Sequence, residues 1–262
     1  QPGDVILKVD QHSRLLGMIN MLSMAATNVV WVSGAGSGMG RASAVELARA
    51  GRRIALSGRR MQALEETAAL VREAGGDALV LPLDVGRDDA SAAVDRIVQE
   101  WGRIDALVLA AGLNAPNRMW ANQDIDEFER IIQTNTVGVA RLVDAALPAL
   151  RQAGGVVVVI SSYSGWTYSP MAGVAYGASK TALGVLTRSI NTQEAGSGVR
   201  ACHLCPGDVD SDFLALRPNV PDAAARAVML SPADVAQAVK FVVDAPAHVR
   251  VDELVISPVS QV

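Results

Sequence analysis

The chain has 262 residues, of which 50% are hydrophobic and 19% charged, and its formal net charge is −4. This length fits one large domain or two small ones, and the apolar half of the chain excludes intrinsic disorder. Because Asp and Glu (27) outnumber Lys and Arg (23), the chain lacks the basic surface of a nucleic-acid-binding protein. Two cysteines cannot build a disulfide scaffold, so we expect a reducing, cytoplasmic setting. No apolar run reaches the roughly 18 residues of a membrane span, so we expect no membrane association.

The first two dozen residues need a separate interpretation. Leu15–Ala26 is mildly apolar and ends in small residues, as the cleavage region of a signal peptide does, but the charges before it cancel instead of giving a positive start. We therefore expect residues 1–24 to be an N-terminal extension or a cloning remnant, in which Gly3–Val9 could form a short edge strand. Residues 25–262 are expected to form a single domain.

From Asn28 onward, short β-branched runs alternate with longer segments of helical periodicity. The predicted strands are Val29–Ser33, Arg53–Ser57, Ala78–Leu81, Ala106–Ala110, Val156–Ile160, Val199–Leu204 and Glu253–Ile256. The predicted helices are Gly40–Ala50, Met61–Ala74, Ala90–Trp101, Ile125–Leu150, Tyr176–Ala195 and Pro232–Asp244. This alternation predicts an α/β fold with a doubly wound parallel sheet of about seven strands and helices on both faces.

A glycine-rich loop follows the first predicted strand, at the carboxyl edge where such sheets bind ligands. The dinucleotide pattern G-x-G-x-x-G fails here, but the spacing Gly34-x-x-x-Gly38-x-Gly40 allows a tight turn and a close approach of the backbone to a pyrophosphate. The phosphates would rest on the N-terminal amides of the next helix. Taken alone, the loop is equally consistent with a flexible turn.

The end of the second predicted strand indicates which dinucleotide is bound. NAD-binding chains usually place a carboxylate there for the ribose hydroxyls. This chain has Gly58 followed by Arg59 and Arg60, and a guanidinium can bind a 2′-phosphate through two hydrogen bonds. NADP(H) is therefore favoured over NAD(H), unless both arginines are merely solvated at the start of a helix.

A second polar cluster follows the fifth predicted strand. Ser162 stands at the strand end, and Tyr176 and Lys180 are four residues apart, so they share one helical face. A nearby ammonium favours the phenolate, so we expect the pKa of Tyr176 to be lowered toward the range of a useful proton-transfer group.

Taken in order, these motifs resemble the short-chain dehydrogenase/reductase family over about Asn28 to Val259. The matching positions are Ser33-Gly34, Gly38, Gly40, Leu83-Asp84-Val85, Ala110-Ala111-Gly112, Asn135, Ser162, Tyr176, Lys180 and Pro206-Gly207-x-Val209-x-Ser211. The resemblance implies a Rossmann-type fold and hydride transfer between a nicotinamide cofactor and a carbonyl or secondary alcohol.

The resemblance also implies roles for individual residues. Tyr176 is the general acid/base, Ser162 binds the substrate oxygen, Lys180 holds the nicotinamide ribose, and Asn135 anchors a water in the proton relay. The implied cofactor-binding residues are Ser33, Gly34, Ser37, Gly38, Met39, Gly40, Arg59, Arg60, Asp84, Val85, Ala111, Gly112, Tyr176, Lys180, Pro206, Gly207, Val209 and Ser211.

Some positions depart from the family pattern or carry an alternative. The family often has Asn where this chain has Ala110, so we expect lower local rigidity but not lost activity. Ser164 competes weakly with Ser162, because Tyr176 lies one residue further from Ser162 than is commonest in the family. Cys202 and Cys205 should face opposite sides of a strand, which disfavours a disulfide or shared metal. The histidines show no metal-ligand spacing, so no metal is expected.

The substrate pocket is the least determined part of the site. Its expected walls are Leu113–Trp120, Ser164–Met171 and Asp208–Met229, and the residues chosen from them are Met119, Trp120, Ser164, Trp166, Tyr168, Met171, Phe213 and Leu214. They predict an apolar, partly aromatic pocket for a small-molecule ketone or secondary alcohol. The resemblance also implies a homodimer or homotetramer that uses the helix Tyr176–Ala195. The alternatives are a catalytically silent NADP-binding regulator or scaffold, and a sugar-nucleotide epimerase or dehydratase.

Overall fold

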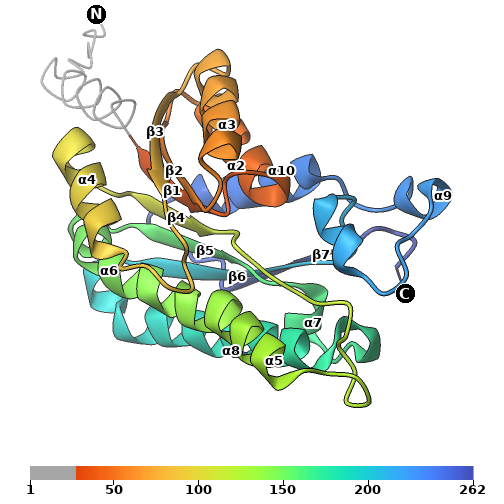
Figure 1. Cartoon of the computed structure of the whole chain (residues 1–262). Helices are drawn as coiled ribbons and strands as arrows, with labels where there is room; N and C mark the ends of the chain where they lie inside the picture. Colours follow the sequence, from red (N-terminus) through yellow and green to blue (C-terminus); the bar gives the residue numbers. More distant parts are fainter. Residues whose placement is uncertain (1–27, 262) are drawn as a thin grey trace, which may run out of the picture.

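Seven parallel strands form the centre of the described part of the chain, residues 28–261 of the computed structural model (Figure 1). Their order in the sheet is β3-β2-β1-β4-β5-β6-β7, and every neighbouring pair is parallel. The expected strand at Gly3–Val9 lies outside the described residues. The bounds are β1 (Val29–Ser33), β2 (Arg53–Gly58), β3 (Asp77–Pro82), β4 (Ala106–Leu109), β5 (Val156–Ile160), β6 (Arg200–Pro206) and β7 (Glu253–Ile256).

Helices cover both faces of this sheet, as the alternating pattern predicted. One face carries α2 (Gly38–Ala48), α3 (Met61–Glu73) and α10 (Pro232–Val243), and the other carries α4 (Ser91–Trp101), α6 (Gly138–Ala153) and α8 (Val174–Gln193) (Figure 1). The shorter helices are α5 (Ile125–Ile132), α7 (Tyr163–Trp166) and α9 (Ala223–Arg226), with single turns at η2 (Pro170–Ala172), η3 (Ala195–Ser197) and η4 (Asp212–Leu216). No helix among residues 28–261 is long and apolar enough to cross a membrane.

Strand β1 shows how the sequence builds two cores. Val30 and Val32 belong to the core beneath α2, α3 and α10, whereas Val29 and Trp31 belong to the core beneath α4, α6 and α8. Successive side chains of a strand point to opposite faces, so a strand covered on both sides must be apolar at every position. The run Val156–Ile160 of β5 is buried throughout for the same reason.

The predicted single helix Ile125–Leu150 is wrong in one respect. The structure divides this segment into α5, a π-helical turn η1 (Gln133–Val137) and α6. Such turns insert one residue into a helix and change the direction of the side chains there. The change brings the polar side chain of Asn135 into the protein interior, where it is fully buried.

The strand order places the functional loops together. The chain passes from β1 through β2 to β3 and then returns to β4 on the other side of β1, so the order reverses between β1 and β4. In open α/β sheets, the loops at the carboxyl ends of strands separate at such a point and leave a crevice for a ligand. The loops after β1 and β4 therefore define where the site must lie.

Candidate active site

The segment from the end of β1 into the first turn of α2 packs so closely that glycine is required at two of its positions. Gly34 has a φ of +66°, and a Cβ there would lie 2.6 Å from the backbone nitrogen of Ala111, in the loop after β4. A Cβ on Gly40 would lie 2.3 Å from the carbonyl oxygen of Gly34. No other residue type permits these approaches without moving the backbone. The loop is thus folded back against both β4 and the first turn of α2.

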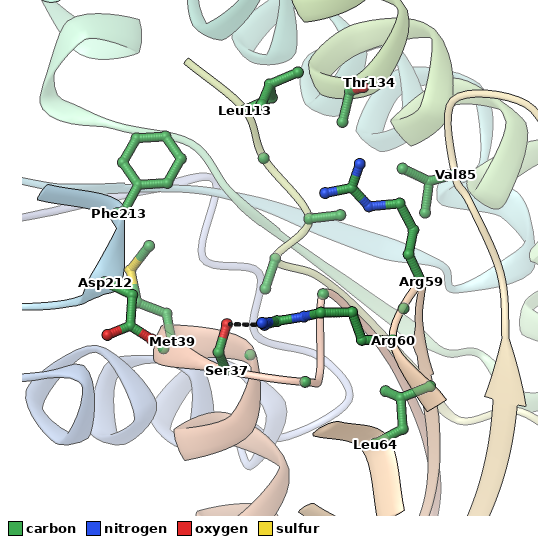
Figure 2. A pocket seen from close by; sticks show the side chains of 18 of the residues that line it. Ser37, Met39, Arg59, Arg60, Leu64, Val85, Leu113, Thr134, Asp212 and Phe213 are labelled. Carbon is green, nitrogen blue, oxygen red and sulfur yellow. Dashed lines mark hydrogen bonds between the residues drawn. The ribbon is translucent and has the colours of Figure 1, made fainter. Parts of the chain in front are cut away.

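The first turn of α2 leaves its amide groups available to a ligand. Its N-cap residue is Ser37, whose side chain makes no capping hydrogen bond, and the first turn contains no acidic residue. Free amides and the positive end of the helix dipole favour an anionic group. These amides, with Gly34, Ala111 and Gly112, border a cavity of about 200 Å³ (Figure 2). The arrangement fits the pyrophosphate of a dinucleotide.

Two guanidinium groups border the same cavity near the end of β2. Arg59 and Arg60 are both exposed, and Arg60 Nη2 lies 3.5 Å from Ser37 Oγ (Figure 2). Strand β2 ends at Gly58, so no carboxylate occupies the position that would bind ribose hydroxyls. The set of donors at this end of the cavity therefore fits a phosphate better than a hydroxyl pair.

The remaining residues expected to bind a cofactor fall into three groups. We call the cavity beside the first turn of α2 the cradle. It is also bordered by Met39, Asp84, Val85 and Ser211. Pro206, Gly207 and Val209 border the adjoining cavity that contains Tyr176. Ser33 borders neither; it is buried, and within residues 28–261 its hydroxyl has no hydrogen-bond partner.

Helix α8 carries Tyr176 and Lys180 to the carboxyl edge of the sheet. Lys180 is 4% exposed, its Nζ donates a hydrogen bond of 3.1 Å to the carbonyl oxygen of Ile160, and the same atom lies 5.7 Å from the centre of the Tyr176 ring. Burial lowers the pKa of Lys180 to about 8. A Cβ on Gly112 would lie 3.7 Å from this Nζ, so the ammonium lies beside a residue that borders the cradle.

The environment of Tyr176 differs from the expected one. Burial raises the pKa of the phenol above its ordinary value, whereas hydrogen bonding by Ser162 and the charges of Arg118 and Arg217 act to lower it. The expectation that Lys180 would lower this pKa is wrong, because burial outweighs the favourable charges, and those charges belong to two arginines. Ser162 is the partner of Tyr176, while Ser164 is buried with its carbonyl against Thr181.

Asn135 links three elements of the site. Its Oδ1 accepts a hydrogen bond of 2.7 Å from the backbone of Leu113, and its Nδ2 donates to the Leu113 carbonyl at 2.9 Å and to Ser179 Oγ at 3.0 Å. These bonds hold the loop after β4 against α8. Since α8 carries Tyr176 and Lys180, Asn135 fixes their position relative to the cradle.

A second cavity of about 420 Å³ adjoins the cradle and contains Tyr176 and Ser162. Five of the expected pocket residues border it: Met119, Ser164, Met171, Phe213 and Leu214. The Phe213 ring lies 5.9 Å from that of Tyr176. We call it the substrate cavity. The other three expected residues, Trp120, Trp166 and Tyr168, are exposed and border a neighbouring cavity of about 590 Å³ that does not include Tyr176.

The substrate cavity is more polar than the sequence analysis predicted. Asn114, Arg118, Asp208, Arg217 and Asn219 border it together with the apolar residues. All five lie within segments predicted as pocket walls, but only apolar and aromatic residues, with Ser164, were selected from those segments. Met119, Met171, Phe213 and Leu214 give the cavity apolar surface, and the polar and charged residues beside them were not predicted.

The two cysteines occupy opposite sides of β6, as their spacing predicted. Cys202 packs in the core beneath α10, whereas Cys205 lies 3.4 Å from His203 Nδ1, and both thiols are free. Burial raises the pKa of each thiol to about 12. His203 also lies 3.1 Å from Glu253 of β7, a proximity that spacing along the chain could not reveal. The absence of a bound metal stays a prediction.

Comparisons with known proteins agree with this geometry. The family model described as short chain dehydrogenase matches residues 28–219. An uncharacterized oxidoreductase of Listeria monocytogenes, Lmo0432, is 30% identical over 245 residues, which cover 89% of this chain and 97% of that protein. The glycine betaine reductase ATRR of Emericella nidulans is 32% identical over 88% of this chain, which spans only 18% of that longer protein.

The solved structures include a similar alcohol dehydrogenase. This enzyme of the archaeon Thermococcus sibiricus, complexed with 5-hydroxy-NADP, is 31% identical and superposes with a TM-score of 0.81, covering 90% of this chain and 98% of the other. The family match covers well over half of the chain, and the relatives agree with it. The chain therefore belongs to the short-chain dehydrogenase family of oxidoreductases.

Proposed function

We propose that the chain is an NADP(H)-preferring oxidoreductase that interconverts a carbonyl compound and a secondary alcohol, with Tyr176 as the general acid/base. One observation carries this proposal. Tyr176 and Ser162 border the substrate cavity beside the cradle, and the ammonium of Lys180 lies 5.7 Å from the centre of the Tyr176 ring.

The chain's own groups supply proton transfer and charge stabilisation. NADP(H), when bound, provides the hydride donor or acceptor. In reduction, Tyr176 gives a proton to the carbonyl oxygen as negative charge develops there, and Ser162 donates a hydrogen bond to the same oxygen. In oxidation, Tyr176 accepts the proton of the hydroxyl group. Lys180 would hold the nicotinamide ribose, and the positive charges of Arg118 and Arg217 favour the phenolate form of Tyr176.

Substitution of Tyr176 tests this assignment. Tyr176→Phe removes only the hydroxyl, so turnover should fall by about two orders of magnitude or more while NADPH affinity stays unchanged. Tyr168→Phe is a matched control, because Tyr168 lies outside the substrate cavity. Unchanged turnover in Tyr176→Phe would refute the role of Tyr176. Tight NADPH binding without turnover of any carbonyl in a broad panel would instead favour a silent NADP-binding protein.

The preference for NADP(H) rests on Arg59, Arg60 and Ser37. A 2′-phosphate placed at this end of the cradle would receive charge-assisted hydrogen bonds from them, which NADH cannot accept. We expect NADPH to bind about tenfold more tightly than NADH, measured by quenching of tryptophan fluorescence. Arg60→Gln should remove most of this difference, whereas Arg96→Gln, on the exposed side of α4, should preserve it. Equal affinities in the unmodified protein would contradict the preference.

We also propose that the protein assembles as a homodimer or homotetramer through α8. The outward side of this helix carries Ala178, Thr181 and Val185, which are exposed and mostly small. The largest of the three, Val185, is 61% exposed. Small apolar side chains let two helices approach closely, so a second copy of α8 is a suitable partner.

A further inference from the structure

Arg118 is a buried cation without a carboxylate partner. Its side chain is 7% exposed, and it forms no salt bridge with any acidic residue of the described chain. Its Nε donates a hydrogen bond of 2.7 Å to the carbonyl oxygen of Ala115, and its two terminal nitrogens donate to those of Ala172 and Leu216. Carbonyl groups satisfy hydrogen bonds but do not neutralise a full charge, and a buried charge without an opposite charge is unfavourable.

The guanidinium has donors left for a ligand. Of its five N–H groups, three are directed at the carbonyls named above, which leaves one on each terminal nitrogen. Arg118 borders the substrate cavity that contains Tyr176 and Ser162. Two N–H groups on one guanidinium form the planar fork that binds a carboxylate through two hydrogen bonds.

Arg217 places a second cation on the same cavity. Its guanidinium is paired with Asp208 at 2.5 Å, and its side chain is 34% exposed. Asp208 is the acidic residue that borders the cavity, so the wall formed by Arg118, Arg217 and Asp208 carries one net positive charge. The charges of both arginines act to lower the pKa of Tyr176, which shows that they lie within electrostatic reach of its hydroxyl.

We propose that the substrate is a hydroxy or keto acid whose carboxylate binds Arg118, with Arg217 beside it, while its hydroxyl or carbonyl group lies at Tyr176. The carboxylate takes no part in the bond changes; it orients the substrate and supplies the negative charge that the cavity lacks. This inference rests on the proposed oxidoreductase function and adds the class of substrate. It also explains why polar and charged residues share the cavity with the apolar ones.

A purely structural role for Arg118 makes a different prediction. The three carbonyls bound by Arg118 belong to three separate segments, at Ala115, Ala172 and Leu216, so its loss could loosen the whole cavity wall. Loosening would impair charged and neutral substrates alike. Loss of a carboxylate-binding group would impair only the charged substrates. The ratio of kcat/KM between an acid and its neutral ester therefore separates the two roles.

The first experiment uses the unmodified protein. Hydroxy acids with the hydroxyl on the second, third or fourth carbon are each paired with their methyl ester, and NADPH formation from NADP⁺ is followed for every pair. For at least one pair, kcat/KM for the acid should exceed that for the ester by about tenfold or more, because the ester loses a charge-assisted hydrogen-bonded pair. Equal or better turnover of every ester overturns the proposed binding of a substrate carboxylate and leaves the proposed function intact. Absence of turnover with all acids, esters and neutral secondary alcohols overturns both.

The second experiment assigns the preference to the two arginines. Arg118→Lys keeps the charge but not the fork, and Arg217→Gln removes a charge that no carbonyl needs. Each should raise KM for the preferred acid by about tenfold and leave KM for the ester within about threefold. Any change in kcat that follows from the lost charge near Tyr176 should be the same for acid and ester. Arg226→Gln is the control, since Arg226 is paired with Asp210 in the same way but borders no part of the substrate cavity. Equal losses for acid and ester in both variants would assign these arginines a structural role and contradict the inference.

Discussion

At the scale of single residues, the buried ammonium of Lys180 has a consequence for stability. Its pKa is about 8 in the folded protein and about 10.5 in an unfolded chain, so folding disfavours the charged form. Below pH 8 the side chain is protonated in both states and the full penalty is present. Between about pH 8 and 10.5 the unfolded state binds more protons, so stability rises with pH.

Lys180→Met removes this titration. The difference in free energy of unfolding, unmodified protein minus variant, should therefore increase by up to about 1.4 kcal/mol for each pH unit above about 8. Urea denaturation at several pH values between about 7 and 10 measures it. Taking the difference cancels the opposite trend of the two thiols, whose raised pKa values make folding less favourable above about pH 9. A difference that stays constant with pH would show that Lys180 is solvated.

Sequence spacing located some residues of the candidate site and missed others for a physical reason. Tyr176 and Lys180 share a helical turn, so their separation of four residues already implies proximity. Arg118 is different. It contacts segments near residues 172 and 216, and a glycine at 173, where a Cβ would lie 2.6 Å from the Arg118 side chain, makes room for it. Such contacts follow from tertiary structure and leave no local pattern.

At the scale of elements, the loop between β1 and α2 depends on backbone shape. Gly34→Ala places a Cβ 2.6 Å from the Ala111 nitrogen at a φ of +66°. We expect the free energy of unfolding to fall by about 1 to 2 kcal/mol or more, with weaker NADPH binding because the cradle widens. Gly177→Ala is the matched control. A Cβ there meets nothing within 4 Å, and alanine in a helix should raise stability by about 0.5 to 1 kcal/mol. Urea denaturation compares them, and equal effects would contradict the packing argument.

Hydrophobic periodicity predicted all seven strands, because a buried parallel strand must be apolar along its length. Val29–Ser33, Val156–Ile160 and Glu253–Ile256 have the predicted bounds, and the others differ by one or two residues at one or both ends. The π-helical turn at Gln133–Val137 was not predicted. Asn135 in this turn forms hydrogen bonds with Leu113 and Ser179, which are distant in sequence, so no local pattern marks the turn.

At the scale of the whole molecule, the site lies at one edge of the sheet, and both helical layers contribute to it. Helix α2 supplies amides from one layer, and α8 supplies Tyr176 and Lys180 from the other. A ligand that contacts both layers stabilises the whole fold, by an amount that depends on its concentration relative to its Kd. Substitutions that move either layer should therefore weaken cofactor binding even where they touch no cofactor atom.

The outward side of α8 is directed away from this site, so assembly and chemistry can be tested separately. Val185→Lys places a charge at the centre of the proposed contact between copies, and burying an unpaired charge is strongly unfavourable. We expect the variant to have the mass of a monomer by light scattering, whereas the unmodified protein has the mass of a dimer or tetramer. Met61→Lys, at a site on α3 that is 52% exposed on the other face of the sheet, should leave the mass unchanged. The proposed contact through α8 would be contradicted if the unmodified protein were a monomer, or if Val185→Lys kept the same assembly. The apolar side chains on the outward side of α8 would then be exposed to solvent.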